Sequence, residues 1–231
     1  MSNTNKLSTD RFLGNGRLYW DSLADDTKFT ATFDLNLFTR LVDHKARILD
    51  FGCGYGRILT ELAHAKYQKL YGVDFSMAML EKTKMALPQI DLIQCCSSQL
   101  PLKDNTFDAV LLIAVLTCIA SDVLQQQLIN ELFRILKPGG LIYVSDFLIN
   151  TDSRNIERYL AFQKNFGSSD YPYGVFNIEE HGLLRHQAED HILKLFSNFK
   201  TMLFEKQKFQ TMGHHKSNGA TVIGMKLEET I

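Results

Sequence analysis

The sequence has few prolines, tryptophans and cysteines and no excess of charge of either sign. Its 231 residues include 4 prolines, 1 tryptophan and 4 cysteines, and 25 Lys and Arg residues almost balance 26 Asp and Glu residues. A chain with 45% hydrophobic and 22% charged residues is not disordered, collagen-like or a coiled coil. Without an excess of positive charge, the composition gives no support to nucleic-acid or acidic-lipid binding. These values predict a globular protein with a substantial core.

The sequence also lacks segments that direct proteins into or across membranes. The first ten residues, MSNTNKLSTD, are polar and contain no apolar core of a secretory signal. The longest nearly unbroken apolar run, 109–120, falls well short of the roughly 20 residues that span a bilayer. We therefore expect a cytoplasmic protein without a transmembrane segment.

The cysteines do not form a metal or disulfide pattern. Cys53, Cys95, Cys96 and Cys118 show no CxxC spacing, and two adjacent cysteines cannot easily chelate one metal or form an ordinary disulfide. We predict four reduced thiols and no metal site.

Apolar runs and helical periodicities alternate along the chain. Short apolar runs predict strands at 46–51, 69–74, 91–94, 107–113 and 141–146. Helical patterns predict helices at 34–43, 56–65, 76–86 and 122–136, the last two capped by Ser76 and Ser121. Short, fully apolar strands are typical of parallel strands that are covered on both faces. The pattern predicts an α/β, Rossmann-like, doubly wound sheet.

The C-terminal part predicts an addition to this sheet. A helix is expected at 187–196, followed by β-rich runs at 201–209 and 218–226 that a short turn would join as an antiparallel pair. We expect seven strands, parallel except for an antiparallel last strand. No repeat or linker divides the chain, so a single domain is predicted.

The most informative segment is 48–57, ILDFGCGYGR, in which a predicted strand runs into three glycines at alternate positions. Glycines there let a ligand approach the backbone closely. The spacing is GxGxG rather than the GxGxxG of dinucleotide-binding folds, which counts against NAD. Asp50 would repel a pyrophosphate and attract an ammonium group. The expected ligand carries a cation.

Asp74 ends the second predicted strand, where the acidic residue of a βαβ nucleotide site binds the ribose hydroxyls. A ligand with a ribose, an ammonium and no phosphate is an adenosylated amino acid. In residues 40–147 the sequence resembles the class I S-adenosylmethionine-dependent methyltransferases, and is most similar to their ubiquinone/menaquinone-biosynthesis-like, small-molecule branch, methyltransferase type 11.

Three segments carry this resemblance. LDFGCGYG at 49–56 resembles the cofactor loop, CCSSQLPLKDNTFD at 95–108 the third motif, and LKPGGLIYV at 136–144 the entry to the fifth strand. The resemblance implies S-adenosyl-L-methionine as cofactor and methyl transfer to a small-molecule acceptor by in-line displacement. It implies cofactor contacts from Asp50, Gly52, Cys53, Gly54, Gly56, Asp74, Phe75, Cys96, Ser97 and Ile113.

The resemblance also implies a division of the single domain. The expected segments are an N-terminal helical cap (1–43), a cofactor-binding core (44–147), a substrate-covering insert (148–185), and a last helix with an edge strand pair (186–231).

The sequence departs from the family in places that matter for chemistry. Cys96 stands where an acid usually accepts from the adenine amino group, so adenine is expected near the Ser97 backbone. Relatives often have paired histidines where this chain reads VLTCI at 115–119, so no histidine base is expected from that loop. No Asn-Pro-Pro-Tyr-type motif follows 107–113, which disfavours amide or exocyclic nitrogen as the methylated atom.

Candidates for the catalytic residue are Asp146, His186 and Tyr19. Asp146 ends a predicted strand beside the cleft, where it would act on the acceptor or be a solvated loop carboxylate. Tyr19 and Trp20, just before an expected N-terminal helix, would form a lid or anchor that helix. The histidines expected near the acceptor, or at the surface, are His181, His186, His214 and His215. The aromatic residues expected to contact an apolar acceptor, or to pack in the core, are Phe162, Phe166, Tyr171, Tyr173 and Phe176.

Two other classes of function stay open. One is a catalytically silent module that binds S-adenosylmethionine or S-adenosylhomocysteine. The other is a nucleotide-dependent oxidoreductase, which the GxGxG spacing disfavours. A macromolecular acceptor has no support from a basic patch, and the oligomeric state is not predicted.

Overall fold

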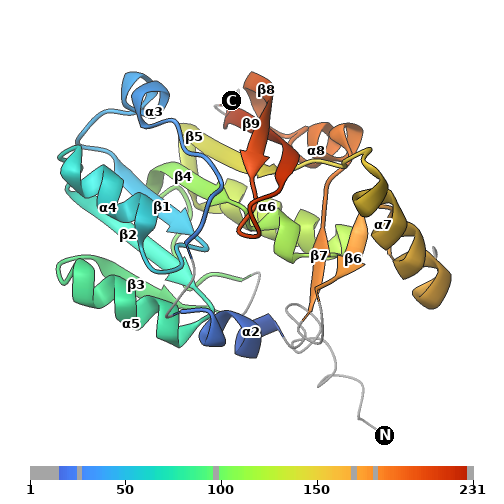
Figure 1. The fold of residues 1–231 in the computed structure, drawn as a ribbon. Coiled ribbons are helices and arrows are strands. Elements are labelled where there is room, and N and C mark those ends of the chain that lie inside the picture. The colour runs from blue at the N-terminus through green and yellow to red at the C-terminus, as the bar shows by residue number, and fades with distance from the viewer. Residues whose placement is uncertain (1–15, 25–27, 96–98, 168–170, 179–181, 228–231) are drawn as a thin grey trace, which may run out of the picture.

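A computed structural model describes residues 16–24, 28–95, 99–167, 171–178 and 182–227. Its centre is a seven-stranded sheet with the strand order β3-β2-β1-β4-β5-β9-β8 (Figure 1). The strands are β1 (Arg47–Phe51), β2 (Lys69–Asp74), β3 (Asp91–Gln94), β4 (Phe107–Ile113), β5 (Leu136–Phe147), β8 (Lys200–Gln210) and β9 (Lys216–Met225). β9 runs opposite to the other six strands and pairs antiparallel with both β5 and β8. The predicted seven-stranded sheet with an antiparallel last strand is confirmed.

Helices cover both faces of the sheet, as is typical of a doubly wound fold. They are α2 (Gly16–Ser22), α3 (Leu35–Leu41), α4 (Arg57–His64), α5 (Met77–Ala86), α6 (Asp122–Ile135), α7 (Ser153–Phe166) and α8 (Glu189–Leu195). A short 3-10 helix, η1 (Leu116–Cys118), follows β4, and a separate hairpin is formed by β6 (Val175–Asn177) and β7 (Leu183–Arg185). Ser76 and Ser121 cap α5 and α6 as predicted, since each hydroxyl accepts from a backbone amide three residues ahead.

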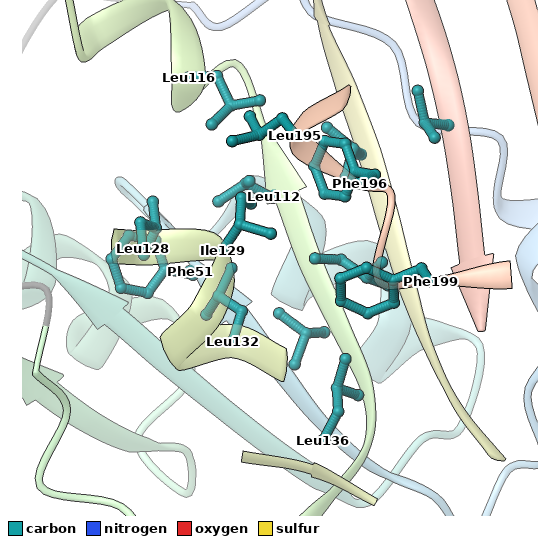
Figure 2. Close-up of a cluster of buried hydrophobic side chains, with 14 of the residues drawn as sticks. Phe51, Leu112, Leu116, Leu128, Ile129, Leu132, Leu136, Leu195, Phe196 and Phe199 are labelled. Carbon is teal, nitrogen blue, oxygen red and sulfur yellow. The ribbon is translucent and has the colours of Figure 1, made fainter. Parts of the chain in front are cut away.

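Alternate residues of the central strands supply two separate cores. On one face, Leu112 of β4 packs with Leu128 and Leu132 of α6 and with Phe196 after α8 (Figure 2). On the other face, Leu111 packs with residues of α3, α4 and α5. Because successive side chains on a strand point to opposite faces, a continuous apolar strand such as β4 can supply both cores.

The segment after β5 differs most from the sequence expectation. The sequence pattern predicts no helix or strand within 148–185, whereas the structure forms α7 and the β6–β7 hairpin there. Figure 1 shows this pair of elements together at the side of the molecule away from α4 and α5. A second difference is β5, which begins at Leu136 rather than at the predicted residue 141. Thus the KPGG segment belongs to the strand and not to a loop before it.

Candidate functional site

A cavity of about 410 Å³ opens at the carboxyl ends of β1, β2 and β4. Ligands of open α/β sheets bind at this edge, where the strand order reverses direction. The cavity extends from the glycine loop after β1 to the elements added after β5, so two chemically different ends share one space. We call them the cofactor end and the acceptor end.

Gly52 and Gly54 of the glycine loop form one wall of the cofactor end, whereas Gly56, also predicted to contact the cofactor, does not line the cavity. Gly52, Gly54 and Gly56 all have positive φ, at +76°, +54° and +81°. A Cβ at Gly54 would lie 2.4 Å from the Phe29 ring, and one at Gly56 would lie 2.7 Å from Thr83 Cγ2. Both positions therefore require glycine for the conformation and for the close approach. The predicted strand-to-helix turn is present, with α4 beginning directly after Gly56.

Asp74 joins the end of β2 to this loop. Its Oδ2 accepts a hydrogen bond from Gly54 N at 2.8 Å, and its Oδ1 accepts one from Ser76 N at 2.9 Å. The carboxyl lines the cavity and is 7% exposed. Burial raises its pKa, while the hydrogen bonds from Ser76, Gly54 and Phe75 oppose the rise. The carboxylate has further lone pairs for ribose hydroxyls, so its place agrees with the predicted role.

Asp50 lies at the end of β1 with an unsatisfied oxygen. Its Oδ2 is buried and has no hydrogen-bond partner, although the residue lines the cavity. Burial raises its pKa to about 7, the positive charge of Arg57 opposes the rise, and Asp74 adds to it. A buried carboxylate oxygen without a partner is costly. An ammonium group would supply the missing partner, so this residue fits the methionine end of an adenosylated amino acid.

Arg57 is a cavity residue that sequence reasoning did not single out. It begins α4, and its Nη2 donates to Ala31 O at 2.6 Å, while its Nε is buried without a partner. Its charge is close enough to lower the pKa of Asp50. An acidic and a basic group at the same end match the two charges of an amino-acid moiety. The signal was present in the sequence, since Arg57 directly follows the last glycine of the loop.

Helix α2 and the segment after it cover the cofactor end. Tyr19 and Trp20 line the cavity from within α2, so the expectation that they precede a helix was wrong. Trp20 packs edge-on against Phe29, whose ring stacks on Tyr55 at 4.9 Å. Ser76 Oγ at the start of α5 donates to Asp21. These contacts put an aromatic cover over the glycine loop and also hold α2 in place, so the lid and the anchor interpretations both stay predictions.

The other predicted cofactor residues divide into those that line the cavity and those outside the described part of the chain. Cys53, Phe75 and Ile113 line it. Burial raises the pKa of the Cys53 thiol well above its ordinary value, so that side chain is a neutral thiol. Cys96 and Ser97 lie outside the described residues. Cys118 also faces the cavity, and burial raises its thiol pKa too.

The acceptor end is built largely from elements that sequence reasoning did not assign. Phe147 at the end of β5 and Phe176 of β6 supply aromatic walls, and Arg154 and Arg158 approach from α7. The turn between β8 and β9 adds Thr211, Met212, Gly213 and His215. This turn reaches the same edge because β9 runs opposite to β5.

His186 faces this end but has the wrong tautomer for a base. Asn150 Nδ2 lies 3.2 Å from its Nδ1, and the Tyr159 hydroxyl contacts the same nitrogen. Asn150 Nδ2 also donates to Leu148 O, which identifies it as the amide nitrogen. Since that group only donates, Nδ1 accepts and Nε2 carries the proton. Burial lowers the His186 pKa to about 3, so the ring is a neutral hydrogen-bond donor.

Asp146 does not line the cavity, contrary to the sequence expectation. It is fully buried, with Oδ2 accepting from Thr117 N at 3.3 Å and Oδ1 from Phe147 N at 2.8 Å. Burial raises its pKa to about 7. It is therefore neither a base next to an acceptor nor a solvated loop carboxylate. It holds the loop after β4 that forms the cavity floor.

Few of the other histidine and aromatic candidates reach the cavity. His215 lines it, His214 is exposed beside it, and His181 lies outside the described residues. Of the five predicted aromatics only Phe176 lines the cavity. Phe162 is buried and stacks on Phe166, which is the core-packing alternative.

In the described part of the chain, no three His, Cys, Asp or Glu side chains are arranged to hold a metal ion. No described helix has the length and apolarity to span a membrane.

Comparison with protein families and curated proteins gives matches centred on the same core. The model of the methyltransferase domain family matches residues 49–144. Methyltransferase-like protein 27 of Homo sapiens is 35% identical over 116 residues, covering 49% of this chain and 44% of that protein. Demethylmenaquinone methyltransferase of Renibacterium salmoninarum is 34% identical over 101 residues, covering 44% and 41%. A tRNA N(3)-cytidine methyltransferase of Danio rerio is 30% identical over 113 residues, covering 44% and 31%. The matched segment spans less than half the length of each relative.

Solved structures extend the likeness over most of the fold. A methyltransferase of Methanosarcina mazei described as S-adenosylmethionine-dependent superposes with a TM-score of 0.78 at 24% identity, covering 86% of this chain and 100% of that one. The 1,6-didemethyltoxoflavin-N1-methyltransferase of Burkholderia thailandensis, solved with its acceptor and S-adenosylhomocysteine, gives 0.63 at 15% identity, covering 99% and 92%. The family model matches residues 49–144, less than half of the chain, and the solved structures share the seven-stranded fold. The glycine loop and its two acids therefore lie in a segment that is similar to the methyltransferase domain family, within a fold shared with solved S-adenosylmethionine-dependent methyltransferases.

Proposed function

We propose that this protein transfers a methyl group from S-adenosylmethionine to a small-molecule acceptor. The observation that carries the proposal is the single cavity with two ends. One end has an unsatisfied Asp50 oxygen beside Asp74 and a glycine loop, and the other has aromatic walls. Bound S-adenosylmethionine supplies an activated methyl group on a sulfonium, and its transfer leaves the neutral thioether S-adenosylhomocysteine.

The residues of the cofactor end each have a binding role in this proposal. Asp50 accepts from the ammonium of the methionine moiety, and Arg57 Nε donates to its carboxylate. Asp74 accepts from the ribose hydroxyls, and Phe75 packs on adenine. Charge-assisted hydrogen bonds of this kind contribute roughly 1.5–3 kcal/mol each.

Alignment of the two reactants accounts for much of the expected rate increase. Tyr19 and Trp20 cover the cofactor end and exclude water, while the loop after β4 forms the floor of the cavity. Asp146 fixes that loop at Thr117 N, and Gln125 Nε2 fixes it at Leu116 O at 3.0 Å. Holding two reactants in line can supply about 7–11 kcal/mol of a reaction barrier.

Two of the relatives support a small acceptor, since their names give demethylmenaquinone and 1,6-didemethyltoxoflavin as the compounds that they methylate. The relative named for tRNA cytidine is the alternative class. A formal net charge of −1 is unfavourable for binding a polyanion, which favours the small acceptor.

The test begins with calorimetric titration of S-adenosylmethionine, S-adenosylhomocysteine and NAD. Binding of the first two without NAD, followed by mass-spectrometric detection of a methylated product in an acceptor screen, is the expected result. Binding without turnover on small molecules or on tRNA would indicate the silent module. Binding of NAD alone would contradict the proposal.

A further inference from the structure

Two arginines lie at the acceptor end of the cavity. Arg154 and Arg158 lie four residues apart on α7 and both line the cavity. Neither makes a salt bridge in the part of the chain that the structure describes. Asp152, which caps the same helix, accepts hydrogen bonds from the Asn155 backbone and side chain, and its charge acts on Arg158 without forming a salt bridge.

Arg158 is held in place by Phe176 and Tyr159 and keeps one buried donor without a partner. Its guanidinium carbon lies 3.5 Å from the centroid of the Phe176 ring, a cation–π contact that fixes the group at the cavity wall. Its Nε is buried and has no hydrogen-bond partner. Burial lowers its pKa, and the positive charge of Arg154 acts in the same direction. A half-buried cation with an unused donor is the arrangement that an anionic ligand would complete.

The position of these cations on α7 is unfavourable for the helix itself. Arg154 is in the first turn, where the helix dipole is positive and favours acidic residues. Like charges four residues apart also repel each other. Arginines that are unfavourable both for the helix dipole and for each other are expected where a residue serves binding rather than helix stability.

The neighbouring groups that line the acceptor end add donors and ring faces, while the negative charge of Asp152, outside the cavity lining, acts on both Arg158 and His186. His186 presents a protonated Nε2, because its Nδ1 accepts from Asn150. Phe147 and Phe176 supply ring faces. Among the described residues that line the cavity, the carboxylates are Asp50 and Asp74, and both belong to the cofactor end. The acceptor end therefore combines two guanidinium groups and an imidazole N–H with apolar walls.

We propose that the acceptor is a small molecule that carries a carboxylate or a similarly compact oxyanion on an apolar or aromatic framework, with Arg154 and Arg158 binding the anion. The inference rests on the proposed methyl transfer and names the acceptor class for it. Phe147 and Phe176 contact the framework, and His186 Nε2 donates to a further oxygen.

The test uses acid and ester pairs that differ only in charge. Suitable pairs are 4-hydroxybenzoate, 3,4-dihydroxybenzoate, 4-hydroxyphenylacetate and indole-3-acetate, each with its methyl ester. Each compound is titrated calorimetrically into protein saturated with S-adenosylhomocysteine, so that only the acceptor end is free. We expect at least one acid to bind about tenfold or more tightly than its ester, as a charge-assisted hydrogen bond predicts.

Three variants connect this preference to the arginines. Arg158→Gln and Arg154→Gln should each weaken binding of the acid about tenfold and leave the ester unchanged. Lys164→Gln is the matched control, because Lys164 is an exposed cation on the same helix outside the cavity. Arg154 is exposed and carries no packing contact with Phe176, so its variant remains informative if Arg158→Gln lowers the Tm.

The outcomes separate the two proposals. Failure of S-adenosylhomocysteine to bind the unmodified protein would contradict the proposed function. If it binds but no acid binds, or every ester binds as tightly as its acid, the anionic-acceptor inference is overturned alone. Equal loss of acid and ester in both arginine variants would also overturn it.

Discussion

The Gly54 amide donates a 2.8 Å hydrogen bond to Asp74 Oδ2, which ties the turn after β1 to the end of β2. Two segments 20 residues apart in the chain thus share one carboxylate. The geometry of the loop and the position of the ribose-binding acid are therefore set together and cannot vary independently.

Replacement of Asp74 should weaken cofactor binding by more than the loss of a single contact. Asp74→Ala removes the ribose acceptor and leaves the Gly54 amide without its partner. We expect affinity for S-adenosylhomocysteine to fall by at least tenfold, about 1.5–3 kcal/mol for each lost hydrogen bond to the charged group. Calorimetric titration with S-adenosylhomocysteine measures this affinity. Asp74→Asn, which keeps one acceptor oxygen, should lose less, and an unchanged affinity in Asp74→Ala would show that the site is misplaced.

A methyl group at Gly54 should block the site by contact as well as by strain. Gly54→Ala would put Cβ 2.4 Å from the Phe29 ring at a φ of +54°. Gly139→Ala is the matched control, because that residue has a φ of +77° and nothing within 4 Å of the new Cβ. Both variants should lose roughly 1–2 kcal/mol of stability from the left-handed conformation. Only Gly54→Ala should also lose cofactor binding, and equal affinities in the two variants would refute the contact.

Cofactor binding should release a proton below neutral pH. Burial holds the Asp50 pKa at about 7, so the free protein keeps this carboxyl largely protonated at pH 6. An ammonium against the carboxylate favours its charged form and lowers that pKa. Titration of S-adenosylhomocysteine in buffers of different ionisation enthalpy should show proton release at pH 6 and almost none at pH 8. Asp50→Asn should abolish the release, and its persistence in that variant would assign it to another group.

Asp146 should affect stability and its pH dependence rather than the chemical step. The folded carboxyl keeps its proton up to about pH 7, whereas in the unfolded chain it ionises near the ordinary value of 3.8. The unfolded state therefore binds fewer protons between these values, and the Asp146 contribution makes the free energy of unfolding fall as pH rises from about 4 to 7. Urea denaturation at pH 5 and pH 7.5 should show a smaller fall for Asp146→Asn. A loss of kcat in that variant without any change in stability would instead indicate a catalytic base.

His186 should remain neutral throughout the physiological range. With its pKa lowered to about 3 and its Nδ1 accepting from Asn150, the ring should show Nε2–H signals in nitrogen-detected NMR without titration between pH 5 and 8. Tyr159→Phe removes a contact to Nδ1 and should cost about 1 kcal/mol of stability. A titration midpoint of the His186 ring near pH 6.5 would contradict a buried, neutral ring that is protonated at Nε2.

The sequence predicted the cofactor end better than the acceptor end for a physical reason. The glycine loop and Asp50 lie at the end of β1, and Asp74 lies at the end of β2. Both strands are short apolar runs that the sequence shows clearly. The bounds of β2, β3 and β4 were predicted without error. By contrast, Arg154 and Arg158 approach Phe176 only through the packing of α7 against β6, which no local pattern encodes. Asp146 was misjudged because a strand-end acid looks the same in sequence whether it faces solvent or two buried amides.

The reversed direction of β9 has a consequence for how this protein can diversify. The turn that joins β8 and β9 lies on the cavity, while β9 pairs with β5 on one side and with β8 up to Gln210 on the other. Insertions or deletions in 211–215 would change the size of the acceptor end without shifting any strand pairing. Changes in this one loop can therefore alter acceptor preference without changing the residues of the cofactor end or the hydrophobic core.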